Sequence, residues 1–190
     1  MVLERRNKPI KAVYFPESGF ASMVSDGGKP IEVGLIGREG MTGLPIIYGA
    51  NVNEHDTYMQ VAGHGHCARA NDLCEAIAQS KTLHGALLKY AFAFHNQTTR
   101  TAVANGRSKI EERLARWLLM AADRLDAGDL PLTHEFLALM LGCRRPGVTV
   151  ALEELERQGV IARRRGHIAI IDRGALEKLS NGTYVPADYD

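Results

Sequence analysis

Hydrophobic positions follow a strand-like period in the first part of the chain. Short runs rich in β-branched and aromatic residues are separated by glycine and proline, and the turn Asp26-Gly27-Gly28 lies between two of them. Such runs predict β-strands, and a turn of this composition predicts a hairpin. Regularly spaced short strands with glycine turns are typical of a small sandwich or barrel. The expected strands fall within residues 12–24, 31–36, 57–62 and 66–70, with a loop over residues 37–43.

The period becomes helical at Asn71, which is expected to be the N-cap of a short helix. A long helix should follow, because an apolar stripe at helical spacing runs from Leu83 to about Val103. Ser108 and Glu111 have the spacing of a capping box and predict the start of another helix.

The stripe on the long helix has two interpretations. It could be ordinary core packed against the β domain, or it could face a second copy of the chain. We favour dimerisation, because the helix is too long to be covered by a small domain alone. The expected dimer contacts are Leu87, Leu88, Ala91, Phe92, His95 and Thr99.

Residues 133–152 read THEFLALMLGCRRPGVTVAL, which is two helical segments on either side of a glycine. Thr133 can cap the first helix, and Pro146 suits the first turn of the second. Gly142 supplies the permissive backbone that a tight turn needs. The pattern predicts a helix-turn-helix. The apolar positions expected to pack the two helices together are Leu137, Ala138, Leu141, Cys143, Val148 and Ala151.

Residues 160–172 are expected to form two short strands joined by an arginine-rich turn. A helix-turn-helix followed by such a hairpin is the sequence form of a winged helix. From Arg144 to His167 the chain has six arginines and three glutamates. This local excess of positive charge is typical of a surface that meets nucleic acid.

Double-stranded DNA is therefore the expected partner, with the second helix in the major groove. Arg144 and Arg145 would lead into the groove, where an arginine donates two hydrogen bonds to guanine, and Thr149 could add a base contact. A winged helix that binds another protein and no DNA is the alternative, and the paired arginines disfavour it. The residues expected to contact phosphates are Thr133, His134, Arg163, Arg164, Arg165 and His167.

Composition limits the class of protein but does not indicate a function. The 190 residues are 45% hydrophobic and 24% charged, as in ordinary globular proteins, and the net charge of +1 hides the basic segment. Apolar runs are too short to span a bilayer, and no apolar segment follows the first residues as in a signal peptide. Three cysteines without a C-x-x-C motif favour a reducing, cytoplasmic location.

The layout of a β-roll, a long helix and a C-terminal winged helix resembles the cyclic-AMP receptor / fumarate-nitrate regulator family of bacterial transcription factors. The segments that carry the resemblance are VYFPESGFASMV, VGLIGREGMTGLP, ERLARWLLMAADR and ALMLGCRRPGVTVALEELERQGVI. It implies an α+β fold and a homodimer that binds a two-fold-symmetric operator, with RNA polymerase as a further candidate partner. The implied domains are a β-roll sensory domain over residues 1–80, a dimerisation helix over 81–106, a winged helix over 107–180 and a tail over 181–190.

The chain departs from the family pattern at several positions. Arg145 matches the family's base-contacting arginine, but Pro146 stands where an acidic residue often follows it, and Val150 occupies a second basic position one turn on. The operator therefore cannot be copied from the best-known members. The resemblance also begins inside the β-roll, which implies either a misassigned start codon or a naturally short roll.

The sensory half gives no reason to expect a known effector. The turn over residues 39–44 has Met41 or Thr42 where cyclic-nucleotide binders need a glutamate. The expected phosphate site has Glu54 and Asp56 and no arginine, so like charges would repel a cyclic nucleotide. No cofactor is predicted, and the effector stays open.

Metal and catalytic chemistry are not expected either. Cys67, Cys74 and Cys143 do not form an iron–sulfur ligand set. His64, His66 and Cys67 could bind a metal only if their side chains converged, and exposed histidines near a turn are the commoner case. Nucleotide-binding loops, nucleophile elbows and zinc-protease motifs are absent from the sequence, so an enzyme is not expected.

Overall fold

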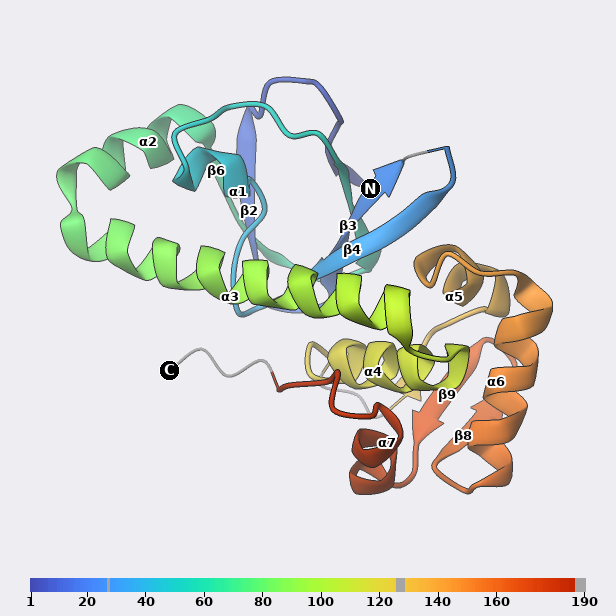
Figure 1. Ribbon diagram of the computed structural model, residues 1–190. Coiled ribbons are helices and arrows are strands. Elements are labelled where there is room, and N and C mark those ends of the chain that lie inside the picture. Colours follow the sequence, from blue (N-terminus) through green and yellow to red (C-terminus); the bar gives the residue numbers. More distant parts are fainter. Residues whose placement is uncertain (27, 126–128, 187–190) are drawn as a thin grey trace. The chain divides into compact units, whose positions relative to one another are not determined.

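The computed structural model describes residues 1–26, 28–125 and 129–186. Their contacts divide the chain into two compact units. Among the described residues the first unit comprises 1–25 and 33–98, and the second comprises 26, 28–32, 99–125 and 129–186. The long helix α3 contributes residues to both units, and Figure 1 shows it without interruption. Residue 106, at which the implied dimerisation helix ends, is Gly106 in the last turn of α3.

The N-terminal strands form two antiparallel sheets, as the period-two pattern and turn residues predict. One sheet has four strands in the order β1-β5-β3-β4, and the other pairs β2 with β6. β3 and β4 are neighbours on either side of the predicted hairpin turn, of which residue 27 lies outside the described residues. β1 was not predicted, since three residues are too few to show a period. The strand bounds are β1 Val2–Glu4, β2 Ala12–Pro16, β3 Phe20–Asp26, β4 Pro30–Ile36, β5 Asp56–Val61 and β6 Gly65–Arg69.

A buried carboxylate joins three parts of this unit. Glu4 is 5% exposed, and its carboxylate accepts hydrogen bonds from the Gly43 backbone N–H, the Asn53 amide (2.7 Å) and the Thr57 hydroxyl (3.1 Å). A buried carboxylate is tolerated only when such donors satisfy it. The short strand β1 is therefore attached by polar contacts as well as by its pairing with β5.

Three helices complete the first half of the chain. α3 packs the apolar side of its N-terminal part into the core, where Tyr90 donates a hydrogen bond to the Met41 carbonyl (2.9 Å). Gln97 bonds both the N–H and the carbonyl of Leu35, at 2.7 and 3.0 Å. Asn71 is not an N-cap, because the second helix begins one residue earlier, with Arg69 as its N-cap. The helix bounds are α1 Leu44–Ile47, α2 Ala70–Gln79 and α3 Lys81–Arg107.

The second unit is a winged helix, and this prediction is confirmed. Its three-stranded sheet has the order β7-β9-β8, and α4 packs against α6 and α7 (Figure 1). The expected capping box lies one residue later, because the Glu112 carboxylate accepts the Lys109 backbone N–H (3.1 Å). The element bounds are α4 Ile110–Ala122, β7 Asp129–Leu130, α5 His134–Met140, α6 Arg145–Arg157, β8 Ile161–Arg164, β9 His167–Ile170 and α7 Arg173–Leu179.

The core of this unit is built around Trp117. Its ring meets Phe136 edge-on, with centroids 5.5 Å apart, and its indole N–H donates to the Glu32 carboxylate (2.6 Å). Arg116, which precedes Trp117 in the chain, is also buried, and desolvation lowers the pKa of its guanidinium to about 10. None of the described helices is both long and apolar enough to cross a membrane. The fully buried leucines of the unit are Leu114, Leu118, Leu119, Leu130, Leu137, Leu152, Leu155 and Leu176.

Candidate nucleic-acid interface

Capping and turn residues fix where each helix of the helix-turn-helix begins. The Phe136 N–H donates to the Thr133 hydroxyl oxygen (3.2 Å), so Thr133 is the N-cap of α5, as predicted. α6 begins at Arg145 with Pro146 in its first turn, where the missing N–H has no helical partner to lose. Val148 and Ala151 are fully buried where the two helices pack.

The turn between the helices requires glycine. Gly142 has φ = 59°, in the left-handed region that side chains disfavour. A Cβ added there would lie 2.6 Å from the Ile31 Cδ1 atom. The carbonyl of Leu141 accepts a hydrogen bond from the Arg113 guanidinium of α4. The turn is therefore fixed by backbone conformation, by close packing and by a charged donor.

One face of α6 is free. Its opposite face is buried, while Arg145, Pro146, Val150, Glu153 and Arg157 are exposed and Thr149 is half-buried. At about 100° per residue, these exposed positions lie within one side of the helix. This is the face that a recognition helix would present to a groove.

Arg145 and Thr149 are held by residues of α5. The Arg145 Nε atom lies 2.9 Å from the Glu135 carboxylate, and both side chains are exposed. The Thr149 hydroxyl lies 3.0 Å from His134 Nδ1 and donates to the Arg145 carbonyl (3.2 Å). Thr149 and His134, expected at a base and at a phosphate, are thus in contact with each other.

The three wing arginines are not equivalent. Arg163 pairs with Glu156 of α6, through Nε at 2.8 Å and Nη2 at 2.5 Å, and its backbone N–H also donates to that carboxylate. These hydrogen bonds lower the pKa of the Glu156 carboxyl. Arg164 and Arg165 are exposed, and neither has an ion-pair partner among the described residues.

The expected DNA-contacting residues gather around one hollow. A volume of about 540 Å³ opens between the start of α5, the start of α6 and the wing. His167, at its rim, lies 3.8 Å from the Asp129 carboxylate. Arg144 and Thr149 are the two expected contacts that do not line the hollow; Arg144 is the exposed N-cap of α6. The expected contacts that do line it are Thr133, His134, Arg145, Arg163, Arg164, Arg165 and His167.

Sequence reasoning missed two acidic residues at this surface. Glu135 and Glu156 each pair with one of the arginines expected to meet DNA. Glu135 follows the cap Thr133 by two positions in the first turn of α5, which is a weak signal that it faces the start of α6. Glu156 lies near the end of α6 and Arg163 lies on β8, so no single helical or strand period relates the two residues. Tertiary contact alone reveals that pair.

The long helix divides the residues expected at a dimer contact. Leu87 is 8% exposed and Ala91 is 1% exposed, since both pack into the core of the first unit. They are therefore used by the chain itself and are not free for a partner. Leu88 (43% exposed) and Phe92 (66% exposed) remain outside, as do His95 and Thr99.

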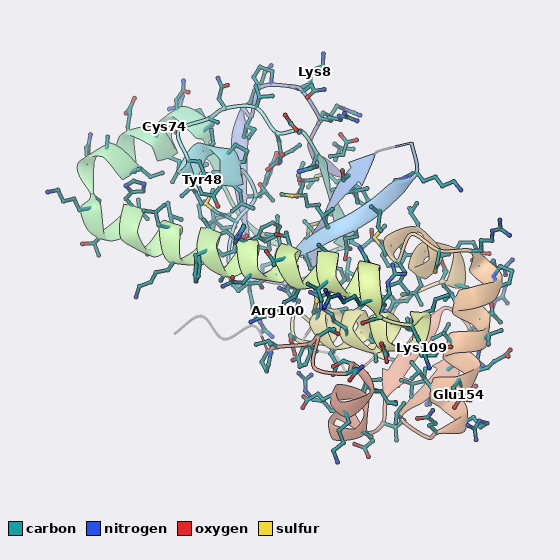
Figure 2. The ribbon with its side chains drawn as sticks, in the orientation of Figure 1. Lys8, Tyr48, Cys74, Arg100, Lys109 and Glu154 are labelled. Atoms are coloured by element: carbon teal, nitrogen blue, oxygen red, sulfur yellow. The ribbon has the colours of Figure 1, made fainter. Side chains whose placement is uncertain are left out.

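The first unit also contains a cavity of about 370 Å³. Its wall is mostly apolar, from Met23, Leu44 and Phe94, with the imidazoles of His55 and His95. Tyr48, labelled in Figure 2, follows α1 and lies at its exposed edge. Neither arginine nor lysine is among the described residues that line it.

The histidines near the β6 turn make local contacts. His64 Nδ1 lies 2.8 Å from the Ser18 hydroxyl, and His66 Nε2 lies 3.2 Å from the Glu17 carboxylate, all at the surface. Cys67 and Cys74 are exposed and Cys143 is half-buried. In the described part of the chain no group of three His, Cys, Asp or Glu side chains is placed to hold a metal ion.

Comparison with known proteins identifies the second half and the fold. Residues 112–179 match the Crp-like helix-turn-helix domain family. FixK2 from Bradyrhizobium japonicum has a TM-score of 0.80 at 18% identity, covering 94% of this chain and 92% of that one. TTHB099, a CRP-family regulator from Thermus thermophilus, has a TM-score of 0.78 at 17% identity, covering 98% and 96%. A putative crp/fnr-family regulator from Eubacterium rectale has a TM-score of 0.72 at 18% identity, covering 96% and 86%.

No curated protein sequence matches the chain. The structural similarity at these low identities concerns the fold, and the helix-turn-helix match concerns residues 112–179. Residues 112–179 therefore match a Crp-like helix-turn-helix domain, and the chain has the fold of the solved CRP/FNR-family regulators.

Proposed function

We propose that the protein is a sequence-specific transcriptional regulator that binds a palindromic operator as a homodimer. The observation that carries this proposal is the hollow between α5, α6 and the wing, which gathers Arg145 and the wing arginines at one surface. A winged helix that bound only protein would have no need to concentrate guanidinium groups beside the exposed face of α6. The alternative without DNA binding is therefore disfavoured.

In this proposal α6 enters the major groove with its N-terminus leading. Arg145 leaves Glu135 and donates two hydrogen bonds to O6 and N7 of a guanine, worth about 1–3 kcal/mol of discrimination. Arg144 and Thr149 are the further base contacts of the proposal. The proposed phosphate contacts are Thr133, His134, Arg163, Arg164, Arg165 and His167, all of which line the hollow. Each phosphate neutralised releases counterions, so affinity should fall steeply with salt.

The exposed part of α3 supplies the proposed dimer contact. Leu88, Phe92, His95 and Thr99 recur at intervals of four, three and four residues, which is a single stripe on a helix. Phe92 at 66% exposure is a large apolar ring in water, and pairing with the same stripe of a second copy would bury it. Two-fold pairing would also present two copies of α6 to two half-sites.

The cavity of the first unit is the proposed effector site. Its apolar wall suits an uncharged or weakly polar molecule, and the two imidazoles offer hydrogen bonds. A cyclic nucleotide does not fit this chemistry, because its phosphate would meet no cationic side chain among the lining residues.

Selection from random duplexes at moderate salt tests the central claim. The wild-type protein should enrich a two-fold-symmetric sequence with a guanine in each half-site. Arg145→Ala should reduce affinity for that sequence by about tenfold or more and relax the preference for guanine. Arg157→Ala is the matched control, because Arg157 is exposed on the same helix but pairs with Glu154 in its last turn (2.6 Å); it should bind almost normally.

Two results would contradict the proposal. One is that the wild-type protein enriches no palindrome. The other is that Arg145→Ala and Arg157→Ala reduce binding equally, which would mean that the positive charge matters but the position does not.

A further inference from the structure

We propose that Val150 is a specificity-determining residue that reads a thymine through the C5-methyl group of that base. The inference rests on the proposed function, since it concerns the same surface of α6. It adds a second base-reading position to Arg145 and gives that position a different chemistry.

Val150 is 60% exposed, although the other large apolar residues of α6 are buried. Val148, Leu152 and Leu155 are each fully covered on the opposite side of the helix. An exposed valine contributes nothing to the core of the free protein. Its position on the face that carries Arg145 therefore suggests a contact made only in a complex.

The exposed face of α6 has a polar edge and an apolar edge. Arg145 and Thr149 are four residues apart and form the polar edge, which α5 positions through Glu135 and His134. Pro146 and Val150 are also four residues apart, and their side chains form the apolar edge beside it. The two edges run side by side along the helix, so a single DNA major groove would contact both.

The apolar edge fits one feature of DNA. In the major groove the thymine methyl is the apolar group among hydrogen-bond donors and acceptors. Valine has no polar atom with which to satisfy the amino group of cytosine or adenine, so those bases would lose hydration without a partner. Thymine is the base that a valine at this position would favour.

Helix geometry limits where that thymine lies. Val150 is five residues after Arg145, which is about 7.5 Å along the axis at 1.5 Å per residue. Base pairs follow one another every ~3.4 Å, so the two contacts should fall within about three base pairs of each other. The half-site should therefore contain a guanine read by Arg145 and a thymine near it.

Removing single methyl groups from the selected operator tests this inference. Each thymine is replaced in turn by deoxyuridine, symmetrically in both half-sites, and affinity is measured for the wild-type protein, Val150→Ala and Val150→Thr. At one thymine within about three base pairs of the guanine, the wild type should lose about fourfold per half-site, the factor expected for one buried methyl. Val150→Ala should bind the unmodified operator less well and lose most of this sensitivity, whereas Val150→Thr, which keeps a methyl group, should retain part of it.

The outcomes separate this inference from the proposed function. If the wild type enriches a palindrome and Val150→Ala keeps the full response to deoxyuridine at every thymine, the valine contact is wrong and the regulator proposal stands. If the wild type enriches no palindrome, the regulator proposal fails and this inference fails with it. Thermal unfolding of both variants should match the wild type, since Val150 is exposed; a large loss of stability would show a structural role instead.

Discussion

The Arg145 guanidinium has two partners in this proposal, the Glu135 carboxylate in the free protein and a guanine in the DNA complex. The Glu135 pair is exposed, so it contributes little to stability, about 0–1 kcal/mol. Its effect on the proposed binding has two parts: it holds the Arg145 side chain over the start of α6, and it places a negative charge beside the surface proposed to meet phosphates. The second part should dominate in binding to random sequence.

Glu135→Gln is therefore expected to raise affinity for random duplex DNA by about two- to fivefold, the range of an exposed charge interaction. The reason is that a neutral amide neither repels phosphate nor competes for Arg145. Equilibrium binding to a labelled random duplex at fixed salt measures the change. Glu75→Gln, an exposed position on α2, removes the same charge far along the chain and serves as the control. An unchanged or weaker affinity for Glu135→Gln would show that the carboxylate assists binding.

At the scale of elements, the helix-turn-helix depends on its glycine turn. Gly142 and Gly159 both have positive φ, at 59° and 72°, but only Gly142 has a close neighbour, Ile31. Alanine at either position meets the left-handed penalty of about 1–2 kcal/mol. Gly142→Ala should lose more than Gly159→Ala, because its Cβ also displaces Ile31.

The chain has a single tryptophan, Trp117, in the core of this unit, so its fluorescence reports the unfolding of the winged helix. Melting both alanine variants by this signal measures the difference. Gly142→Ala should also weaken operator binding, since α6 follows the turn directly. Equal melting temperatures for the two variants would mean that the Ile31 contact adds nothing.

The pair of Glu156 and Arg163 joins α6 to the wing strand β8. The Arg163 hydrogen bonds lower the pKa of the Glu156 carboxyl below its ordinary value of 4.5, and Arg157 lowers that of Glu154 to about 2. A carboxyl with a lowered folded-state pKa stabilises the fold above its unfolded-state pKa. This stabilisation is lost as pH falls through the folded-state value. The acid dependence of both pairs therefore begins near pH 4.5 and extends downward.

Glu156→Gln should be less stable than the wild type near neutral pH, and the difference should shrink as the pH falls from about 5 to about 3. Urea unfolding followed by Trp117 fluorescence at several pH values measures it. Glu153→Gln is the matched control, an exposed glutamate of the same helix, and should show the wild-type acid profile. A difference between wild type and Glu156→Gln that does not change with pH would contradict the ion-pair origin. Figure 2 labels Glu154 on the same helix, where its pairing remains in both variants.

At the scale of the whole molecule, the exposed stripe of α3 is the proposed contact between two copies of the chain. Phe92→Glu places a charge at the most exposed ring of the stripe, where a partner would have to bury it. The wild type should sediment as a dimer at micromolar concentration and Phe92→Glu as a monomer. Ala86→Glu introduces the same charge at an exposed position of α3, about 120° around the helix from Phe92, and should stay dimeric. A monomeric wild type would remove the dimer from the proposal.

The monomeric variant should also change the mode of DNA binding. A palindrome is read by two copies of α6, so loss of the dimer leaves one half-site contact per chain. Affinity for the full operator should fall toward that for a single half-site, while a half-site duplex should be bound nearly as well as before. Gel-shift titration on both duplexes distinguishes these cases.

The order of residues alone predicts the local chemistry of the helix-turn-helix and the wing. Helix caps and tight turns depend on neighbours within about four residues, so the sequence can predict them. This holds for the Thr133 cap, the Gly142 turn and the helix start at Pro146. The arginine-rich turn of the wing was likewise predicted from the sequence.

Contacts between distant parts of the chain determine which of these side chains are exposed and which are paired. Leu87 and Ala91 are buried in the core of their own unit. Arg163 forms an ion pair with Glu156, and Arg145 forms one with Glu135. Val150 is exposed on the face of α6. Burial and ion pairing depend on residues that are distant in sequence or lie on another element, whereas periodicity records only which side of an element a residue occupies. For this reason the pattern could predict a DNA-reading helix, but only the folded chain shows which of its side chains remain available to read.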